Sequence, residues 1–213
     1  MLNWGVLDVP NVSFVDEDSS VRYLLEYDYV DLGLPSGLKW AKCNVGATSP
    51  EQAGLYFAWG ETTGYTADDV TSGVRLFIQN VYDTGPAASI KNDLTLEQDA
   101  AHVNLGGNWR MPTKDEYQEL LDNCDVVWTA DYNGTGVAGK VFTSKVNGNS
   151  VFFPATGECY NSSVDYVGER GYYWSANFGM TIYDAYKLFF NSRNHNMYSE
   201  PRSYGHSVRA VCE

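Results

Sequence analysis

The pattern of residues 140–153 constrains the fold of this chain more than any other segment. Residues 140–146 and 149–153 are rich in Val, Phe and Thr, and they flank the dipeptide Asn147-Gly148. β-branched and aromatic residues favour strands, and Asn-Gly accepts the positive φ angles of a type I′ turn. The segment is therefore predicted to form a β-hairpin. Similar patterns predict strands at 172–175, 185–190 and 206–211, and an earlier hairpin that joins 29–32 to 38–41.

Helix signals occur earlier in the chain. Three hydroxyl residues that can cap a helix are each followed three positions later by Gln or Glu: Ser49, Thr95 and Thr113. The second helix is expected to end near residues 105–107 and the third near 123–124. Helices in the first half and antiparallel strands in the second half predict an α+β fold. We assign residues 29–213 to one domain and residues 1–28 to an N-terminal arm or edge segment.

Charge excludes several classes of partner. The formal net charge of −13 argues against sequence-independent binding to nucleic acid and against docking on an anionic membrane. Residues 1–31 carry a net charge of −6, whereas residues 171–213 carry +1. There is no run of 18 apolar residues, so no membrane insertion is predicted. The start lacks a signal-peptide pattern, so either the chain is a mature form or it leaves the cell by another route, for example inside a virion.

The sequence offers little for catalysis. The three histidines have no metal-ligand spacing, and neither a nucleophile elbow nor a phosphate-binding loop is present. The four cysteines allow three pairings and form no CxxC motif; free thiols are favoured, but disulfides stay open. Asp68-Asp69 and Asp115-Glu116 could bind calcium, although such pairs usually lie on solvated faces. We therefore predict no catalytic residue, no metal and no cofactor.

Residues 171–213 combine six Tyr, four Asn and five Ser. This mixture is typical of a recognition surface, because Tyr gives a large contact area at low entropic cost while Ser and Asn give adaptable hydrogen bonds. Residues that alternate as core positions are assigned to the scaffold: Trp174, Tyr186, Leu188, Phe190, Val208 and Val211. Polar and Tyr residues without an apolar period are predicted to lie in loops and bind the ligand: Tyr183, Asp184, Asn194, His195, Asn196, Tyr198, Ser199, Ser203 and Tyr204.

Several motifs resemble one family. Residues 107–117 (Gly-Asn-Trp-Arg-Met-Pro-Thr-Lys-Asp-Glu-Tyr) resemble a helix-start signature of the formylglycine-generating-enzyme branch of the C-type lectin fold. Residues 202–211 resemble the closing strand of that branch. Residues 34–47 and 56–61 resemble a paralogous surface-protein family of gut bacteria that has the same fold. Together these motifs cover residues 29–213, and the closest similarity is to the variable proteins of diversity-generating retroelements.

The resemblance implies a binding protein. No cysteine lies between Tyr160 and Val211, so the cysteine pair of the oxidase is not matched, and Glu200-Pro201-Arg202 departs from the calcium-binding tripeptide of sugar-binding lectins. In the variable proteins, mutagenesis at adenines yields Asn, Tyr, Ser, His, Asp and Phe but not Lys, Met, Trp, Gln or Glu. All the predicted ligand-binding residues are permitted outcomes, whereas Trp174, Met180, Lys187, Met197 and Glu200 are not.

The expected protein is a non-enzymatic adhesin on a bacterial surface or a phage virion, which binds a cell-surface protein or glycan. It could form homo-oligomers through residues 1–28. A lectin of fixed specificity and a structural surface or tail protein of the same fold remain alternatives.

Overall fold

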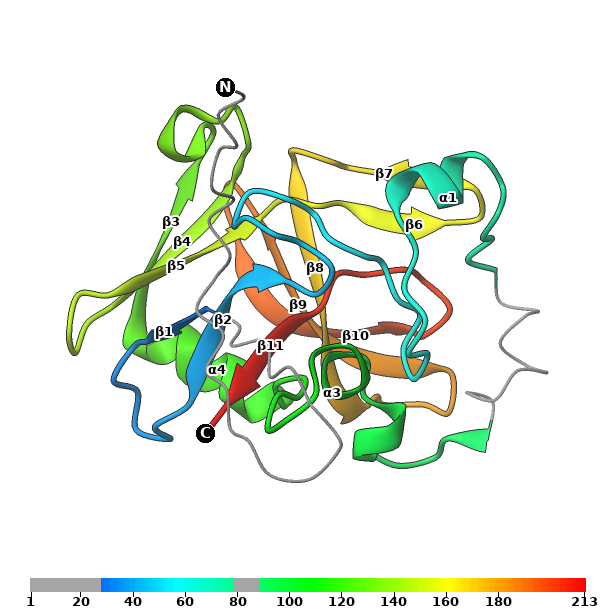
Figure 1. The fold of residues 1–213 in the computed structure, drawn as a ribbon, viewed down its shortest axis with the longest axis horizontal. Helices are drawn as coiled ribbons and strands as arrows, with labels where there is room; N and C mark the ends of the chain where they lie inside the picture. The colour runs from blue at the N-terminus through cyan, green and yellow to red at the C-terminus, as the bar shows by residue number, and fades with distance from the viewer. Residues whose placement is uncertain (1–27, 79–88) are drawn as a thin grey trace, which may run out of the picture.

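We describe a computed structural model of the chain, covering residues 28–78 and 89–213 (Figure 1). The predicted N-terminal arm therefore lies outside the described residues, apart from Asp28. The elements in chain order are β1 (Tyr29–Asp31), β2 (Lys39–Asn44), α1 (Ala67–Thr71), the 3₁₀ helix η2 (Leu96–Gln98), α3 (Ala100–Leu105), α4 (Lys114–Asn123), β3 (Cys124–Thr129), the 3₁₀ helix η3 (Tyr132–Gly134), β4 (Gly139–Ser144), β5 (Ser150–Pro154), β6 (Glu158–Tyr160), β7 (Ser163–Asp165), β8 (Arg170–Phe178), β9 (Asp184–Asn191), β10 (His195–Pro201) and β11 (Arg209–Cys212).

The strands form small antiparallel sheets. β2 lies between β1 and β11, so the first and last strands belong to one sheet, as the blue and red strands of Figure 1 show. The strands β3, β4 and β5 form a second sheet, β8, β9 and β10 a third, and β6 and β7 a two-stranded ribbon. The predicted α+β class is confirmed at this level, because short helices are combined with mostly antiparallel strands.

Two groups of buried side chains form the core. One lies around Trp59 and Trp174, and the other lies around Trp40, Tyr117 and Phe190. Helix α4 packs on the second group through Tyr117, whose ring centroid is 5.5 Å from that of Trp40. Burial of such aromatic side chains supplies much of the free energy that stabilises a domain of this size. Five of the six residues assigned to the scaffold are buried in these groups, whereas Tyr186 is half-buried and belongs to neither group.

The hairpin predicted at residues 140–153 is present, but its turn differs. Strands β4 and β5 pair in register Thr143 with Ser150, which leaves a loop longer than the predicted two-residue turn. Within this loop only Gly148 has a positive φ, of 77°, whereas a type I′ turn needs two such residues, so the turn is not type I′. The reason is that Ser144 is tied down within the fold: its hydroxyl donates to the Leu32 carbonyl at 2.5 Å and accepts a hydrogen bond from the Val146 amide at 3.1 Å.

The helix predicted at Thr113 is confirmed, because Thr113 caps α4 through a capping box with Glu116. The helix predicted from Thr95 to residues 105–107 is divided: the Thr95 amide donates to Gln98 Oε1 at 3.1 Å before the short η2, and α3 begins separately with Asp99 as its cap. The helix predicted at Ser49 is absent. Residues 49–52 form only a turn, because the residues that follow them make backbone hydrogen bonds to other segments instead of continuing a helix. The Leu55 amide donates to the Val45 carbonyl at 2.9 Å.

The strands predicted near the C-terminus are present as β8, β9 and β11. The residues predicted as a long polar loop after Asn191 form β10 instead, which pairs with β9 along its whole length. This strand lies at the edge of the sheet and all its residues are exposed or half-buried, which suits polar side chains. In residues 28–78 and 89–213, no helix is long and apolar enough to cross a membrane.

Candidate functional site

The sheet of β8, β9 and β10 divides the predicted ligand-binding residues between two sides. Directly paired residues share a side of an antiparallel sheet. His195 and Ser199 lie on the side that faces α4, where Leu188 and Phe190 are buried. We call this the α4 side. Asn196, Tyr198 and Glu200 lie on the opposite side, which we call the His206 side.

The His206 side is built by cross-strand pairing. Tyr198 of β10 is paired with Lys187 of β9, which is paired with Trp174 of β8. The segment between β10 and β11 covers the Trp174 end of this side. His206 stacks there, with its ring centroid 4.1 Å from that of Trp174.

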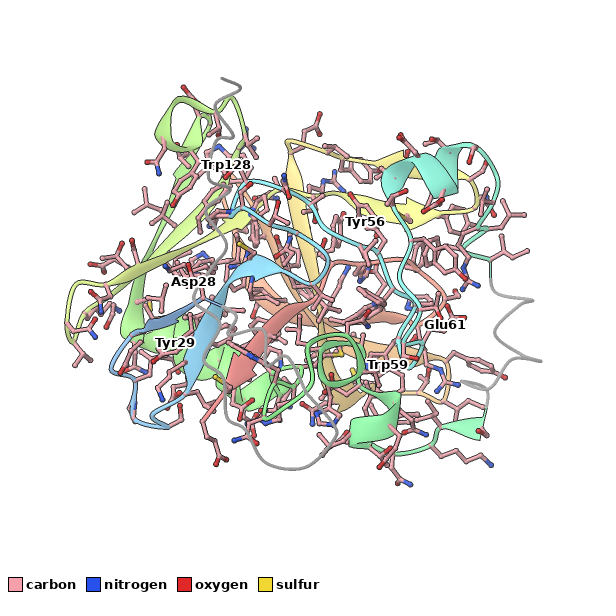
Figure 2. The ribbon with its side chains drawn as sticks, viewed as in Figure 1. Asp28, Tyr29, Tyr56, Trp59, Glu61 and Trp128 are labelled. Atoms are coloured by element: carbon pink, nitrogen blue, oxygen red, sulfur yellow. The ribbon has the colours of Figure 1, made fainter. Side chains whose placement is uncertain are left out.

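Neighbouring segments hold the covering segment in place. The Phe57 amide donates to the His206 carbonyl at 2.9 Å, and the Trp59 amide donates to the Arg202 carbonyl at 3.0 Å. On the other flank, Gly205 pairs with Cys159 of β6. Tyr56 and Trp59, labelled in Figure 2, belong to the same segment as Phe57. Trp59 Nε1 anchors that segment by donating to the Ser175 carbonyl at 2.8 Å. The position of His206 is therefore set from both flanks.

Six aromatic rings form a continuous row on the His206 side. We call them the aromatic row: Tyr198, Phe189, Tyr172, His206, Tyr204 and Tyr160. Centroids of successive rings lie between 5.0 Å, for Tyr160 and Tyr204, and 6.2 Å, for Tyr204 and His206. The centre of the row is buried, whereas Tyr198 is 49% exposed at one end and Tyr160 is 45% exposed at the other. The row thus offers an exposed tyrosine at each end.

A charged cluster lies among the rings. Its members are Glu158, Lys187, Glu200 and His206. His206 Nε2 is 3.5 Å from Glu158 Oε2 and 3.6 Å from Glu200 Oε2. Lys187 Nζ contacts Glu200 Oε2 and lies 4.2 Å from the centroid of the Tyr172 ring.

Burial shifts the protonation of this cluster. Burial lowers the pKa of His206 to about 4, so the imidazole is neutral at pH 7. Burial also lowers the pKa of Lys187 to about 7, although the charge of Glu158 opposes this shift. Burial raises the pKa of Glu158, but its contacts with His206 and Lys187 outweigh that effect and lower the pKa overall. Burial therefore disfavours the charged forms of both His206 and Lys187.

Four predicted residues occupy two places at opposite ends of the sheet. Tyr183 is 53% exposed in the turn between β8 and β9, beside Asp184, whose carboxylate accepts a hydrogen bond from Thr181 at 2.8 Å. Asn194 and His195 lie at the opposite end of the sheet, where β10 begins. A strand rise of about 3.3 Å per residue separates His195 from Ser199 by about 13 Å. The nine predicted residues thus do not form one contiguous patch.

Two predicted positions need correction. Ser203 is only 6% exposed, so it does not belong to the open surface. It lies in the segment that is hydrogen-bonded to Phe57, Trp59 and Cys159, and these bonds keep the segment, with its polar residue, packed against the rest of the domain. His195 is exposed, but on a strand and not in a loop. Its Nδ1 is 2.9 Å from Lys140 Nζ, and because an ammonium group can only donate, Nδ1 accepts.

Sequence reasoning missed the charged cluster. Glu158 is 42 positions before Glu200, so no local motif connects them. The one available signal was Lys187, a charged residue between apolar neighbours on a strand that is buried on both sides. Buried lysines are rare unless they are paired. Among the described residues, one group of metal-ligating side chains lies close together: the ligand atoms of Glu158, Glu200 and His206 are all within 4.8 Å of one another.

A cleft of about 420 Å³ lies at the Arg170 end of the sheet. Trp128 of β3, labelled in Figure 2, lines it together with Arg170, Asn191 and Arg193. Arg170 also stacks over the Tyr166 ring at 3.7 Å from the centroid and donates to the Tyr172 hydroxyl at 3.4 Å. The cleft is therefore connected to the aromatic row through Tyr172.

The chain was compared with family models, with curated proteins and with solved structures. No family model, curated protein or solved structure matches it.

Proposed function

We propose that this chain is a non-enzymatic, adhesin-type binding domain of the C-type lectin fold, which recognises a cell-surface protein or glycan through the His206 side of its C-terminal sheet. It would work on a bacterial surface or a phage virion, as the variable proteins of diversity-generating retroelements do. The observation that carries the proposal is the aromatic row, with its exposed tyrosine at each end.

The chemistry of this surface suits recognition. Tyr and Asn side chains provide contact area and hydrogen bonds without a reactive group. Tyr198 and Asn196 project from a paired strand, which holds them at low entropic cost when a ligand binds. Exposed Tyr183 lies beside the segment between β10 and β11, because its carbonyl accepts a hydrogen bond from the Arg202 amide at 2.9 Å.

The distribution of residue types also supports a variable surface. Adenine mutagenesis cannot produce Trp, Lys or Met, and Trp174 and Lys187 are buried while Met197 is half-buried. The permitted residues Asn196 and Tyr198 are exposed. Framework and variable positions would therefore separate by burial, with two exceptions: Met180 is 79% exposed, and the permitted residue Ser203 is only 6% exposed.

Binding to whole bacterial cells and to a glycan array tests the proposal. Tyr183→Ala and Tyr198→Ala, together in one chain, are expected to reduce binding at least tenfold. Both side chains are about half exposed, so the free energy of unfolding should change by less than about 1 kcal/mol. Tyr204→Ala should in contrast lower stability, because the half-buried Tyr204 packs on Tyr160 and His206.

The matched control is Tyr29→Ala. Tyr29 is 44% exposed but lies on β1, outside the sheet of β8, β9 and β10 (Figure 2). Equal loss of binding in the control and in the double variant, or full binding by the double variant, would refute the proposal. Sequencing the gene gives an independent check of variability: a downstream repeat should differ from codons 171–209 only at adenines.

A further inference from the structure

The charged cluster leaves buried polar atoms without hydrogen bonds. Both ring nitrogens of His206 and Glu158 Oε2 have no hydrogen bond, whereas Glu200 Oε2 is in contact with Lys187 Nζ. The side chain of His206 is fully buried between Tyr172 and Trp174. Buried polar atoms are almost always satisfied in folded proteins, by the protein itself, by water or by an ion. The nature of the missing partner follows from the geometry.

The spacing of these atoms matches a tetrahedral metal site. Ligand atoms that are each about 2.1 Å from a tetrahedral ion lie about 3.4 Å from one another. The separations of His206 Nε2 from Glu158 Oε2 and from Glu200 Oε2 are 3.5 and 3.6 Å. The group needs only a small further closure, because all three ligand atoms already lie within 4.8 Å.

We infer that Glu158, Glu200 and His206 bind a divalent transition-metal ion of the zinc type, with Lys187 as an internal competitor for the same two carboxylates. Imidazole and carboxylate ligands suit Zn²⁺ and Co²⁺. Ca²⁺ is disfavoured, because it requires six to eight oxygen ligands and this cluster offers four carboxylate oxygens. The side chain of Glu200 is 24% exposed, which leaves a route for the ion and for a water ligand.

Lys187 competes with a metal ion for the carboxylates of the site. Its ammonium group contacts Glu200 and so neutralises part of the charge that attracts a cation. A divalent ion and the ammonium group repel each other, so the lysine side chain must withdraw from Glu200 when the ion binds. Removal of the lysine should therefore strengthen metal binding.

A bound ion would join three separate segments. Glu158 comes from β6, Glu200 from β10, and His206 from the segment before β11. Tyr204 lies between two of these ligands in the chain. The ion would therefore fix the part of the aromatic row that contains Tyr204, and it would do so whether or not the row binds a ligand.

Titration of the full chain with ZnCl₂ by calorimetry, and with CoCl₂ by visible absorption, tests the inference. The wild type should bind one zinc ion per chain, and the Co²⁺ form should show the intense absorption of tetrahedral coordination. Glu158→Gln and Glu200→Gln should each weaken binding about tenfold or more. Lys187→Met should tighten it. Circular dichroism and thermal unfolding establish that each variant is folded.

His102→Gln is the control, since His102 lies on α3 and bonds to the Trp109 carbonyl at 3.1 Å, outside the cluster. It should bind zinc as the wild type does. The inference is overturned if the wild type binds no zinc at millimolar concentration, whatever Lys187→Met does. It is also overturned if both glutamine variants bind as tightly as the wild type, because the metal would then lie elsewhere.

Discussion

Replacement of Arg209 by Met tests how the first and last strands are joined. The side chain of Arg209 is fully buried in β11 and donates four hydrogen bonds to oxygen atoms of other strands. Nε donates to Asn44 Oδ1 at 2.9 Å, Nη1 donates to the carbonyls of Ala41 at 2.9 Å and Lys42 at 2.7 Å, and Nη2 donates to the Phe152 carbonyl at 3.0 Å. The guanidinium also lies 4.5 Å from the centroid of the Phe153 ring. One side chain thus links β11 to β2 and β5.

The magnitude follows from these bonds. A hydrogen bond to a charged donor contributes about 1.5–3 kcal/mol net, so four bonds represent roughly 6–12 kcal/mol. Burial of a charge without a carboxylate partner costs several kcal/mol, and Met removes that cost too. The oxygens left without a donor should make Arg209→Met about 3–5 kcal/mol less stable. That is a large part of the roughly 5–15 kcal/mol that stabilises a typical domain.

Urea unfolding monitored by tryptophan fluorescence measures this loss. In a domain of this size, about 3–5 kcal/mol corresponds to a fall of roughly 6–20 °C in Tm. Arg209→Lys should also be destabilised, because an ammonium group cannot reach the four oxygens with the geometry of a guanidinium. Arg193→Met in the exposed turn before β10 is the control, with an expected change below about 0.5 kcal/mol. A stability of Arg209→Met within about 1 kcal/mol of the wild type would refute the reasoning.

Three further predictions concern stability and reactivity. Glu116→Gln should destabilise α4 by about 1–2 kcal/mol in urea at pH 7, because it weakens both the capping box and the pair with Arg110 at 2.6 Å. Burial raises the pKa of Glu116, but the hydrogen bonds from Arg110 and Thr113 outweigh burial and lower the pKa overall. The stability that wild-type Glu116 contributes is therefore present above pH 4.5 and is lost as the pH falls through the lowered pKa of the folded state. A stability advantage of the wild type that grows in acid would contradict this. Gly157→Ala should lower the free energy of unfolding by more than about 2 kcal/mol, because a Cβ there would lie 2.1 Å from the Asp165 carbonyl oxygen at a φ of +70°, and an unchanged Tm would contradict the described turn. Cys159 should react with a thiol reagent only on unfolding, because it is fully buried and burial raises its pKa. Half-buried Cys43 and Cys212 should react first, and rapid labelling of all four free thiols in the native protein would contradict this order.

The success of individual sequence predictions depended on the range of the interactions behind them. Thr113 and Glu116 cap α4 as predicted, because the capping box involves only residues three positions apart. The box that begins α1 was missed, since Asp69 stands where Glu or Gln was sought. Ser49 carries the same local signal as Thr113, yet no helix follows, because Leu55 bonds to Val45 and Tyr56 bonds to Tyr65, both outside the segment. Local signals decide a segment only where tertiary pairing does not compete.

The candidate site shows the same division. Tyr198 and Asn196 were identified by residue type, and both are exposed. His195 and Ser199 were grouped with them, but the pairing of β10 with β9 places these two on the α4 side. A strand alternates its side chains between two sides of a sheet, so the register decides which residues a ligand can reach. Composition does not contain the register.

The sequence by itself determined the α+β class, the capped start of α4, the strands β8, β9 and β11, most of the scaffold residues and the Tyr- and Asn-rich composition of the C-terminal segment. These properties depend on residue type and on neighbours a few positions away. Only the tertiary structure decided which tyrosines form the aromatic row and which charges meet beneath it. Glu158, Lys187, Glu200 and His206 come together because four segments pack around one histidine, and packing of distant segments is a property of the whole fold.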